Sequence, residues 1–440
     1  MGIPNILFLL LLIAAIAWFS SNAKKVIRNI RFGKELDRSD NVAERWKTMG
    51  RVALGQSKML TRPIPAILHI FVYVGFVLIN IEVLEMLIDG AIGTHRILSF
   101  MGDFYKFLLS FFEILAFLVT FGCVIFLIRR NILRIKRFRN KELNGWPRSD
   151  ANIILISEIL LMSALFLMNA SEQVLKDHGI GHYLSAFPGG LPVSQYLSPL
   201  LAGLSDEKLI FIERSCWWFH IIGILGFLNY LPYSKHFHIL LAFPNTWFSN
   251  LDPKGKFTNL ASVTNEVKAM LDSSFVPLPA DPDKPVVRFG AKDVFDLSWK
   301  QLLDAYSCTE CGRCTSACPA NQTGKLLSPR KIMMDTRDRL EEVGKNTDAN
   351  KGVYQEDGKS LQNYISSEEL WACTSCNACV QECPVNIDPL SIIVDMRRYL
   401  VMEQSMAPQG LNLMFTNVEN NGAPWQFSPA DRLKWREEGS

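Results

Sequence analysis

Five long apolar segments constrain this chain more than any other feature, because an apolar run of about 20 residues forms a helix that crosses a bilayer. The segments are residues 3–20, 64–88, 107–128, 153–168 and 209–231. All lie in the first 245 of 440 residues, and hydrophobic residues make up 49% of the chain, which is high for a soluble protein. The sequence therefore predicts an all-α fold that begins with a five-helix transmembrane bundle over residues 1–245.

The charges around the first apolar segment argue against a cleaved signal peptide. No Lys or Arg precedes this segment, whereas Lys24, Lys25 and Arg28 follow it. A signal peptide has the opposite arrangement, with its positive charge in front. We therefore expect an uncleaved first span whose amino terminus lies outside the cell. The whole chain carries a formal net charge of only +3, which gives no reason to expect a nucleic-acid partner.

The loops between the predicted spans alternate in positive charge. Residues 22–63 carry eleven Lys or Arg and residues 129–148 carry eight, whereas residues 89–106 and 169–208 carry two each. Short loops rich in Lys and Arg stay on the cytoplasmic side of a membrane. The sequence thus predicts a multi-pass protein of the inner (cytoplasmic) membrane, with its carboxyl-terminal half in the cytoplasm.

Eight of the ten cysteines form two copies of the pattern C-x2-C-x2-C-x3-C-P, the spacing of bacterial two-cluster ferredoxins. Three thiolates on a tight loop hold three corners of one cubane, and the fourth cysteine, followed by proline, reaches the neighbouring cluster. The predicted ligands are Cys308, Cys311, Cys314 and Cys383 for the first 4Fe-4S cluster, and Cys373, Cys376, Cys379 and Cys318 for the second.

Two other uses of these cysteines fit less well. Structural zinc sites show two separated C-x2-C pairs rather than four cysteines within eleven residues. Disulfides do not persist in the reducing cytosol, where the loop charges put this half of the chain. Iron–sulfur clusters remain the best interpretation.

The repeat continues beyond the cysteines, since P-x-x-I-x-x-D-x-R-x-x-L begins at both Pro329 and Pro389. A capping residue, Ser328 or Asp388, precedes each proline, which is typical of a helix start. Each half is therefore predicted to be a cluster loop followed by a helix. We expect a mainly α-helical ferredoxin-type domain over residues 301–405, a Pro-rich extended linker over 246–300 and a polar surface tail over 406–440, although the tail could instead be a strap that docks a partner.

Histidines inside or beside apolar spans are functional candidates, because polar groups are costly in a bilayer. His220 and His238 lie 18 residues apart, which would place them on one helix face about 27 Å apart, with His236 on another face. His69, near the cytoplasmic end of the second span, and His238 could together hold a b-type haem iron. The alternative is that His238 is an ordinary residue at the membrane interface.

The stretches L-H-I-F-V-Y-V-G at His69 and F-H-I-I-G-I-L-G-F-L-N-Y-L-P-Y-S-K-H-F-H-I ending at His238 resemble the gamma subunit of respiratory nitrate reductase and related heterodisulfide-reductase membrane subunits. This resemblance implies a quinone-reactive cytochrome b domain with two b haems, each between a histidine of span two and one of span five. His69, His220 and His238 match three of the four ligand positions, but the fourth is Ile79. We therefore expect one b haem, on His69 and His238.

Three interpretations of His220 remain open. It could bind a second haem together with an unusual partner, it could belong to a quinol site, or it could be a hydrogen-bonded core histidine. Acidic residues in the spans bear on the quinol interpretation. Glu82, Glu85 and Glu113 could take protons from a quinol, or could pair with Arg214 or Lys106.

The stretch F-G-A-K-D-V-F-D-L-S-W-K-Q-L-L-D-A-Y-S-C-T-E-C-G-R-C-T-S-A-C-P-A, with G-K-L-L-S-P-R after it, resembles the small iron–sulfur subunit of heterodisulfide-reductase-like complexes over residues 288–405. Members of that family commonly work with a second protein that carries C-C-G motifs, where the substrate reacts. This chain contains no C-C-G, so no catalytic residue of its own is expected and a partner is implied. An electron-transfer flavoprotein is a further expected partner.

Together these features predict an electron-transfer subunit of a membrane oxidoreductase complex. Electrons would pass between a membrane quinone and a cytoplasmic partner through one b haem and two 4Fe-4S clusters. Two other functions stay open: an anchor for a flavin dehydrogenase of the glycerol 3-phosphate type, and a haem-free membrane iron–sulfur protein that acts as a redox sensor or scaffold.

Overall fold

A computed structural model of the chain describes residues 2–133, 135–187, 190–276 and 288–437, apart from the side chains of residues 185 and 186. The regular structure of these residues is helical and contains no strand, only an isolated bridge between Lys34 and Ser298. The predicted all-α class is therefore confirmed for the described part of the chain.

Five helices are long and apolar enough to cross a membrane, as the sequence predicts. They are α1 (Ile3–Ile30), α3 (Pro63–Ile92), α4 (Asp103–Leu127), α5 (Trp146–Asp177) and α8 (Asp206–Tyr230). Each is longer than its apolar segment, because the polar residues that flank the segment continue the helix. We call these five helices the helical bundle.

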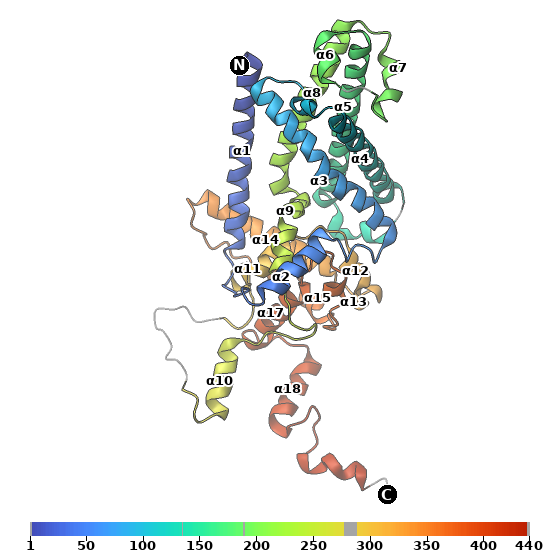
Figure 1. Cartoon of the computed structure of the whole chain (residues 1–440). Coiled ribbons are helices and arrows are strands. Elements are labelled where there is room, and N and C mark those ends of the chain that lie inside the picture. The colour runs from blue at the N-terminus through green and yellow to red at the C-terminus, as the bar shows by residue number, and fades with distance from the viewer. Residues whose placement is uncertain (1, 134, 188–189, 277–287, 438–440) are drawn as a thin grey trace.

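The bundle helices pack in chain order, with α3 against α4, α4 against α5, and α5 against α8, while α1 packs against α3 and α8 (Figure 1). Short helices lie between them: α2 (Val42–Met49), α6 (Gly181–Ala186) and α7 (Ser198–Leu201). After α8, Pro232 lies in a 3-10 turn, and the chain enters the shorter helix α9 (His238–Trp247).

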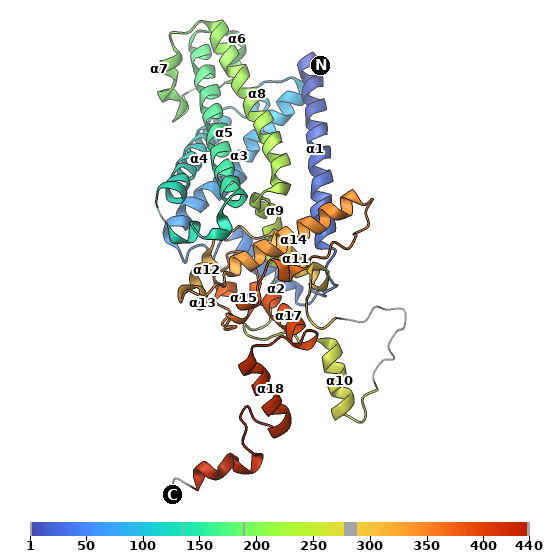
Figure 2. The ribbon, with the colours of Figure 1, turned by 180° about the vertical axis from the view of Figure 1, so that it is seen from behind.

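The remaining helices form a cysteine domain, residues 288–405, at one end of the bundle (Figure 2). We call this end of the bundle the near end and the opposite end the far end. The helices are α11 (Trp299–Tyr306), α12 (Arg313–Ala317), α13 (Pro319–Gln322), α14 (Pro329–Ala349), α15 (Ser367–Trp371), α16 (Ala378–Glu382) and α17 (Pro389–Met402).

The predicted repeat is visible in this domain. The side chain of Ser328 caps α14 and that of Asp388 caps α17, with a proline at the first turn of each helix, as the sequence predicts. The equivalent helices also pack on each other, α12 against α16 and α14 against α17. The two halves therefore form one unit rather than two independent modules.

The bundle and the cysteine domain share one hydrophobic core. Val26 of α1, Leu231 and Phe237 pack in the same cluster as buried residues of α11, α14 and α17. The last turn of α1 adds polar contacts, because Asn29 donates a hydrogen bond of 2.9 Å to the Tyr306 hydroxyl. The first apolar helix thus ends inside the cysteine domain.

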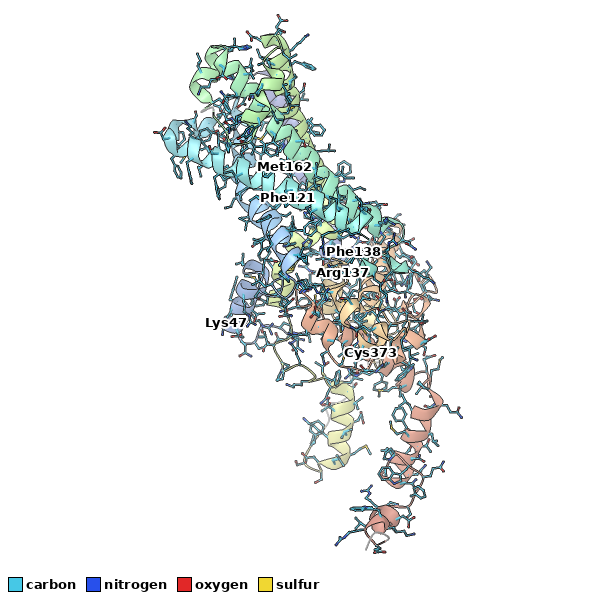
Figure 3. The ribbon with its side chains drawn as sticks, turned by 90° about the vertical axis from the view of Figure 1, so that its right-hand side faces the viewer. Lys47, Phe121, Arg137, Phe138, Met162 and Cys373 are labelled. Carbon is cyan, nitrogen blue, oxygen red and sulfur yellow. The ribbon has the colours of Figure 1, made fainter. Side chains whose placement is uncertain are left out.

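Both Lys- and Arg-rich loops contact the cysteine domain. Lys58 donates to the Cys383 carbonyl at 3.2 Å, and Arg62 pairs with Glu382 at 3.3 Å. From the other loop, the Arg137 carbonyl accepts a hydrogen bond of 2.8 Å from Arg330. Figure 3 shows Arg137 at the junction between the bundle and the cysteine domain. The two basic loops therefore lie on the same side of the bundle as the cysteines.

The predicted linker and tail both contain helices. Helix α10 (Ala261–Leu271) lies within the linker, whereas the Pro-rich stretch 277–285 lies outside the described residues. The tail contains α18 (Gln409–Asn421), which projects away from the bundle (Figures 1 and 2). The tail exposes large apolar side chains, namely Met406, Leu413, Phe415, Val418, Trp425, Phe427, Leu433 and Trp435.

Gly344 allows α1 to pack closely against α14. A Cβ atom at Gly344 would lie 2.4 Å from Nδ2 of Asn29. Gly344→Val should therefore displace Asn29, break its bond to Tyr306 and destabilise the fold by about 2 kcal/mol. The measurement is the midpoint of thermal loss of visible cluster absorption. Gly410→Val, in helix α18, is the control, because nothing lies within 4 Å of that position. Equal midpoints for the two variants would contradict this account of the packing.

Candidate functional site

The two cysteine loops have the same backbone conformation. In the first loop Glu310 and Gly312 have positive φ angles of 54° and 70°, and in the second Ser375 and Asn377 have 57° and 59°. Such left-handed residues turn the chain sharply. The turns let three cysteines of one loop face a common point. A short helix, α12 or α16, begins directly after the second left-handed residue of each loop.

The structure groups the cysteines across the two repeats. Cys308, Cys311, Cys314 and Cys383 line one small cavity, together with residues of the first loop. In the second loop, Cys373 and Cys379 each interact electrostatically with Cys318 of the first repeat. In both places, three cysteines of one repeat lie near the last cysteine of the other repeat. Their role as ligands remains a prediction.

The surroundings of these thiols suit a metal cluster. Burial raises the pKa of Cys308 to about 12 and that of Cys383 to about 11, so thiolates here need a nearby positive charge, which iron supplies. Two backbone N–H groups donate to cysteine sulfur, Ser375 to Cys373 at 3.4 Å and Ile387 to Cys383 at 3.3 Å. Hydrogen bonds to sulfur tune the reduction potential of an iron–sulfur cluster.

The arginine that recurs in the repeated sequence contacts the cysteine loop of its own half. Arg337 on α14 pairs with Glu310 at 2.9 Å, and Arg397 on α17 donates to the Leu370 carbonyl at 3.0 Å, just before Cys373. Sequence comparison of the two halves shows both arginines but does not reveal what they contact. Each places a positive charge beside one group of cysteines.

The two groups differ in exposure. Each group has two buried cysteines, Cys308 and Cys383 in the first and Cys318 and Cys379 in the second, but only the second contains an exposed cysteine, Cys376. Arg313, next to Cys314, donates to the Lys58 carbonyl at 2.9 Å, so the first loop lies against a bundle loop. The first group therefore faces the bundle, and the second has access to solvent.

A buried ion-pair network connects the bundle to the first cysteine loop. Lys235, which follows helix α8, pairs with Glu310 and lies 3.7 Å from Asp150 at the start of α5. Their side chains are only 8%, 3% and 2% exposed, respectively. Glu310 also binds Arg337, so two cations and two carboxylates balance each other. Lys235 and Glu310 were not singled out from the sequence, although Glu310 lies inside the C-T-E-C motif.

Three histidines lie together at the near end of the bundle. His69 of α3 interacts electrostatically with both His236 and His238, and the rings of the last two are 5.5 Å apart. The prediction that His236 points away from His238 is wrong. It assumed one continuous helix from His220 to His238, but α8 ends at Tyr230 and Pro232 follows.

His69 and His238 have the chemistry that a haem iron needs. The Nδ1 atom of His69 is buried and has no hydrogen-bond partner. In His238, Nδ1 lies 3.0 Å from the Lys235 carbonyl, which assigns the proton to Nδ1 and leaves Nε2 free for a metal. Burial also lowers the pKa of His238, so its ring is neutral. His69 and His238 are therefore the residues that would hold a haem, and the haem itself stays a prediction.

His220 has a different environment. It is buried, and its Nδ1 is 2.8 Å from the Leu161 carbonyl. Ile79, at the position where the resemblance expects a fourth histidine, is buried in the apolar core that also contains Leu161 and Ile221. As in His238, the contact of Nδ1 leaves Nε2 of His220 free, but Ile79 offers no second ligand atom, so a second haem on this pair would lack a ligand. The hydrogen bond to Leu161 also fits the interpretation of a core histidine.

The acidic residues of the spans have partners that the sequence did not indicate. Glu82 pairs with Arg96 at 3.0 Å, and Glu85 accepts a hydrogen bond of 2.7 Å from the Tyr105 hydroxyl. Glu113 accepts a bond of 2.7 Å from the backbone N–H of Val193. The alternative that these acids pair with Arg214 or Lys106 is not what the structure describes, since Arg96, Tyr105 and the backbone of Val193 are their partners.

Comparison with known proteins agrees with the cysteine geometry. Residues 307–387, which include all eight motif cysteines, match the family described as 4Fe-4S dicluster domain. This chain is therefore similar to iron–sulfur proteins over its cysteine domain. No solved structure matches the chain.

Several curated proteins are similar to longer parts of the chain. The probable iron-sulfur-binding oxidoreductase FadF of Bacillus subtilis is 28% identical over 98% of this chain and 61% of its own length. EtfAB:quinone oxidoreductase of Syntrophomonas wolfei is 27% identical over 92% of this chain and 55% of its own length. The chain thus spans between half and two thirds of these two relatives.

The cysteine domain alone has a third relative. One component of a CoB-CoM heterodisulfide reductase of Methanosarcina acetivorans is 34% identical over 27% of this chain and 60% of its own length. The similarity to heterodisulfide-reductase proteins is therefore confined to a part of the chain, whereas the first two relatives also match the bundle.

Lys235 should contribute strongly to stability. Lys235→Met leaves Glu310 and Asp150 buried with one cation fewer, so the free energy of unfolding should fall by about 3 kcal/mol. Lys235→Arg keeps the positive charge, so its free energy of unfolding should fall by less. The thermal midpoint of visible cluster absorption measures this difference. Lys434→Met is the control, since the exposed pair of Lys434 with Asp431 contributes little. If the Met variant at position 235 melts like the control, the network is not important for stability.

Proposed function

We propose that this chain is the membrane-bound electron-transfer subunit of a respiratory-type oxidoreductase complex. It passes electrons between the quinone pool and a cytoplasmic partner, through one b haem and two 4Fe-4S clusters. The relatives named as iron–sulfur and quinone oxidoreductases support this class of function. The resemblance of the bundle to the nitrate reductase gamma subunit supplies the cytochrome b part of the proposal.

One observation carries the proposal. Lys235 contacts the histidine cluster and the first cysteine loop at the same time, because its carbonyl faces Nδ1 of His238 and its ammonium group binds Glu310. A residue that touches both sites fixes their relative position. The near end of the bundle and the first cysteine group are thereby held as neighbours in an electron-transfer path.

His69 and His238 would hold the haem, which when bound supplies a one-electron carrier at the near end of the bundle. The Lys235 carbonyl would orient the His238 ring through Nδ1. His220 and Ile79 would hold no second haem, for the reasons given above. His236, adjacent to His238, would line the site without binding iron.

The exposure of the cysteines suggests the order of the two clusters. The group of Cys308, Cys311, Cys314 and Cys383 would receive electrons from the bundle side, because it faces the bundle. The group of Cys373, Cys376, Cys379 and Cys318 would exchange electrons with the partner, because Cys376 is exposed. Arg337 and Arg397 would stabilise the negative charge that each cluster gains on reduction.

The partner would carry the substrate site. A heterodisulfide-reductase-like C-C-G protein is the expected partner, because the cysteine domain resembles the small iron–sulfur subunit of such complexes and the sequence contains no C-C-G motif. An electron-transfer flavoprotein is a second expected partner, suggested by the name of the Syntrophomonas relative. The exposed apolar side chains of α18 and the tail are available for docking such a protein.

The proposed location is the inner membrane, with the amino terminus outside and the cysteine domain in the cytoplasm. Support comes from the two Lys- and Arg-rich loops, which lie at the near end with the cysteine domain. Reporter fusions after Gly179 and after Gly422 test the orientation, since the first should report the outside and the second the cytoplasm.

Removal of either proposed haem ligand should abolish the haem. His69→Ala and His238→Ala should remove the b-type bands from the reduced-minus-oxidised spectrum of the purified protein. His236→Ala and His220→Ala are matched controls that should keep the bands. If the His236 variant lost the b-type bands and the His238 variant kept them, His236 rather than His238 would be the haem ligand. A wild-type spectrum without b-type bands would favour the haem-free interpretation.

Cysteine variants test the order of the clusters. Cys376→Ala should damage only the solvent-facing cluster, so a menaquinol analogue should still reduce the other cluster while transfer to a soluble acceptor falls at least tenfold. Cys311→Ala should instead block reduction of both clusters from the membrane side. Electron paramagnetic resonance of the reduced protein distinguishes the two clusters. The reverse pattern would mean that the order is inverted, and copurification of a flavin dehydrogenase would favour the anchor function.

A further inference from the structure

A second group of metal-binding side chains lies at the far end of the bundle, away from the cysteine domain. It consists of His95, from the loop after α3, Glu172 of α5 and Glu213 of α8. One ligand atom from each of these residues lies within 4.8 Å of the others. Neither the quinone pathway nor the cysteine chemistry described above uses this triad.

One ring nitrogen of His95 faces the two carboxylates and has no hydrogen-bond partner. Its Nε2 is buried, unpartnered and 3.5 Å from Oε1 of Glu172, and the side chain is only 10% exposed. The unprotonated nitrogen of a neutral imidazole is the atom that binds a metal ion. This unpartnered nitrogen distinguishes the triad from an ordinary acidic cluster.

The carboxylates are oriented by arginines, which leave one oxygen of Glu172 free but bind both oxygens of Glu213. Arg96 binds Oε2 of Glu172 at 2.9 Å, and Oε1 faces His95 instead. Glu213 binds Arg214 and accepts a bond of 3.2 Å from the Tyr183 hydroxyl, but each carboxylate oxygen can also bind a metal ion. Hydrogen-bonded carboxylates are usual in metal sites, because the second partner fixes the ligand geometry.

Arg214 is the one group that must move. Its guanidinium lies 3.4 Å from Nδ1 of His95, whereas a metal bound at Nε2 requires the proton on Nδ1. The side chain of Arg214 is 43% exposed, so it can turn toward solvent while Glu213 stays buried. The contact with His95 is long for a hydrogen bond, but the same movement breaks two hydrogen bonds of Arg214 to the buried Glu213, and the bound metal ion must replace them.

The charge of the surrounding network favours a divalent cation. Arg96 interacts with Glu82, Glu85 and Glu172, and its backbone N–H binds Asp89 at 2.7 Å. With Glu213, five buried or largely buried carboxylates therefore surround two guanidinium groups, those of Arg96 and Arg214. Excess negative charge in a buried site is costly unless a cation or protons compensate it.

His182 lies outside the triad but could supply a fourth ligand if its side chain turns toward it. The ring of His182 lies 4.6 Å from that of His95, and His182 is exposed to solvent. It can therefore close the site from outside and provides a route by which an ion enters. Two histidines and two carboxylates match the nitrogen and oxygen ligands that zinc accepts in tetrahedral sites.

We propose that His95, Glu172 and Glu213 bind one divalent transition-metal ion of the zinc class, with His182 as fourth ligand. The ion fastens the loop after α3 and the start of α6 to helices α5 and α8. It acts as a structural clamp on the far end of the bundle. The proposal does not depend on the electron-transfer function.

Zinc binding to the full-length protein in detergent tests the proposal. After incubation with zinc chloride and removal of free metal, the wild type should retain one zinc per chain. X-ray absorption should show only nitrogen or oxygen neighbours at about 2.0 Å. Sulfur neighbours at about 2.3 Å would place the zinc in the cysteine loops and overturn the proposal. Retention of no zinc by the wild type would also overturn it.

Two variants and a control make the test specific. His95→Gln and Glu172→Gln should weaken zinc binding at least tenfold, as expected when a metal site loses a ligand. His178→Ala is the control, because His178 pairs with Asp206 near the same end of the bundle but outside the triad. Equal binding by all three variants would overturn the proposal.

Hydrogen exchange gives a second measurement that does not depend on variant stability. Zinc should slow the amide exchange of residues 93–102 in the wild-type protein, because the ion restrains this loop. Unchanged exchange at saturating zinc would contradict the clamp, even if some zinc were bound elsewhere.

Discussion

The buried pairing of Lys235 with Glu310 is the contact on which the arrangement of the two halves depends. A buried ion pair is stable only when its geometry is good and its remaining hydrogen-bonding positions are satisfied. Here Asp150 and Arg337 complete the set, and these four residues come from the bundle, the segment after α8, the first cysteine loop and α14. The network can therefore form only when the bundle and the cysteine domain are docked in one orientation. A second buried ion pair between the halves, Arg330 with Glu142 at 2.7 Å, restricts the same orientation.

Much of the fold could be predicted from the sequence, because it depends on local properties. Apolar length indicated the five spans, and the Ser328 and Asp388 caps marked the starts of α14 and α17. The cysteine groups were also predictable, since the C-x2-C-x2-C-x3-C-P spacing limits which sulfur atoms can meet. Here the spacing of the cysteines within a short motif determines which cysteines can lie close together.

The errors in the predictions arose where contacts between residues far apart in the sequence determine the structure. Helical phase failed at His236, because Pro232 ends the regular helix before that residue. Arg96 was not recognised as a partner of Glu82, since the pairing depends on how the loop after α3 folds back. The core shared by α1 and the cysteine domain was also missed, because no periodicity in the sequence indicates which element a helix will meet.

The position of Asn29 has a consequence for how the protein is made. The end of α1 fills part of the cysteine domain, where Val26 joins the core and Asn29 binds Tyr306. The first helix leaves the ribosome long before the cysteines do, so it waits for a binding surface that has not yet been synthesised. The cysteine domain made without α1 would expose to water the apolar surface that Val26 covers. This domain therefore becomes complete only when the first helix is in place.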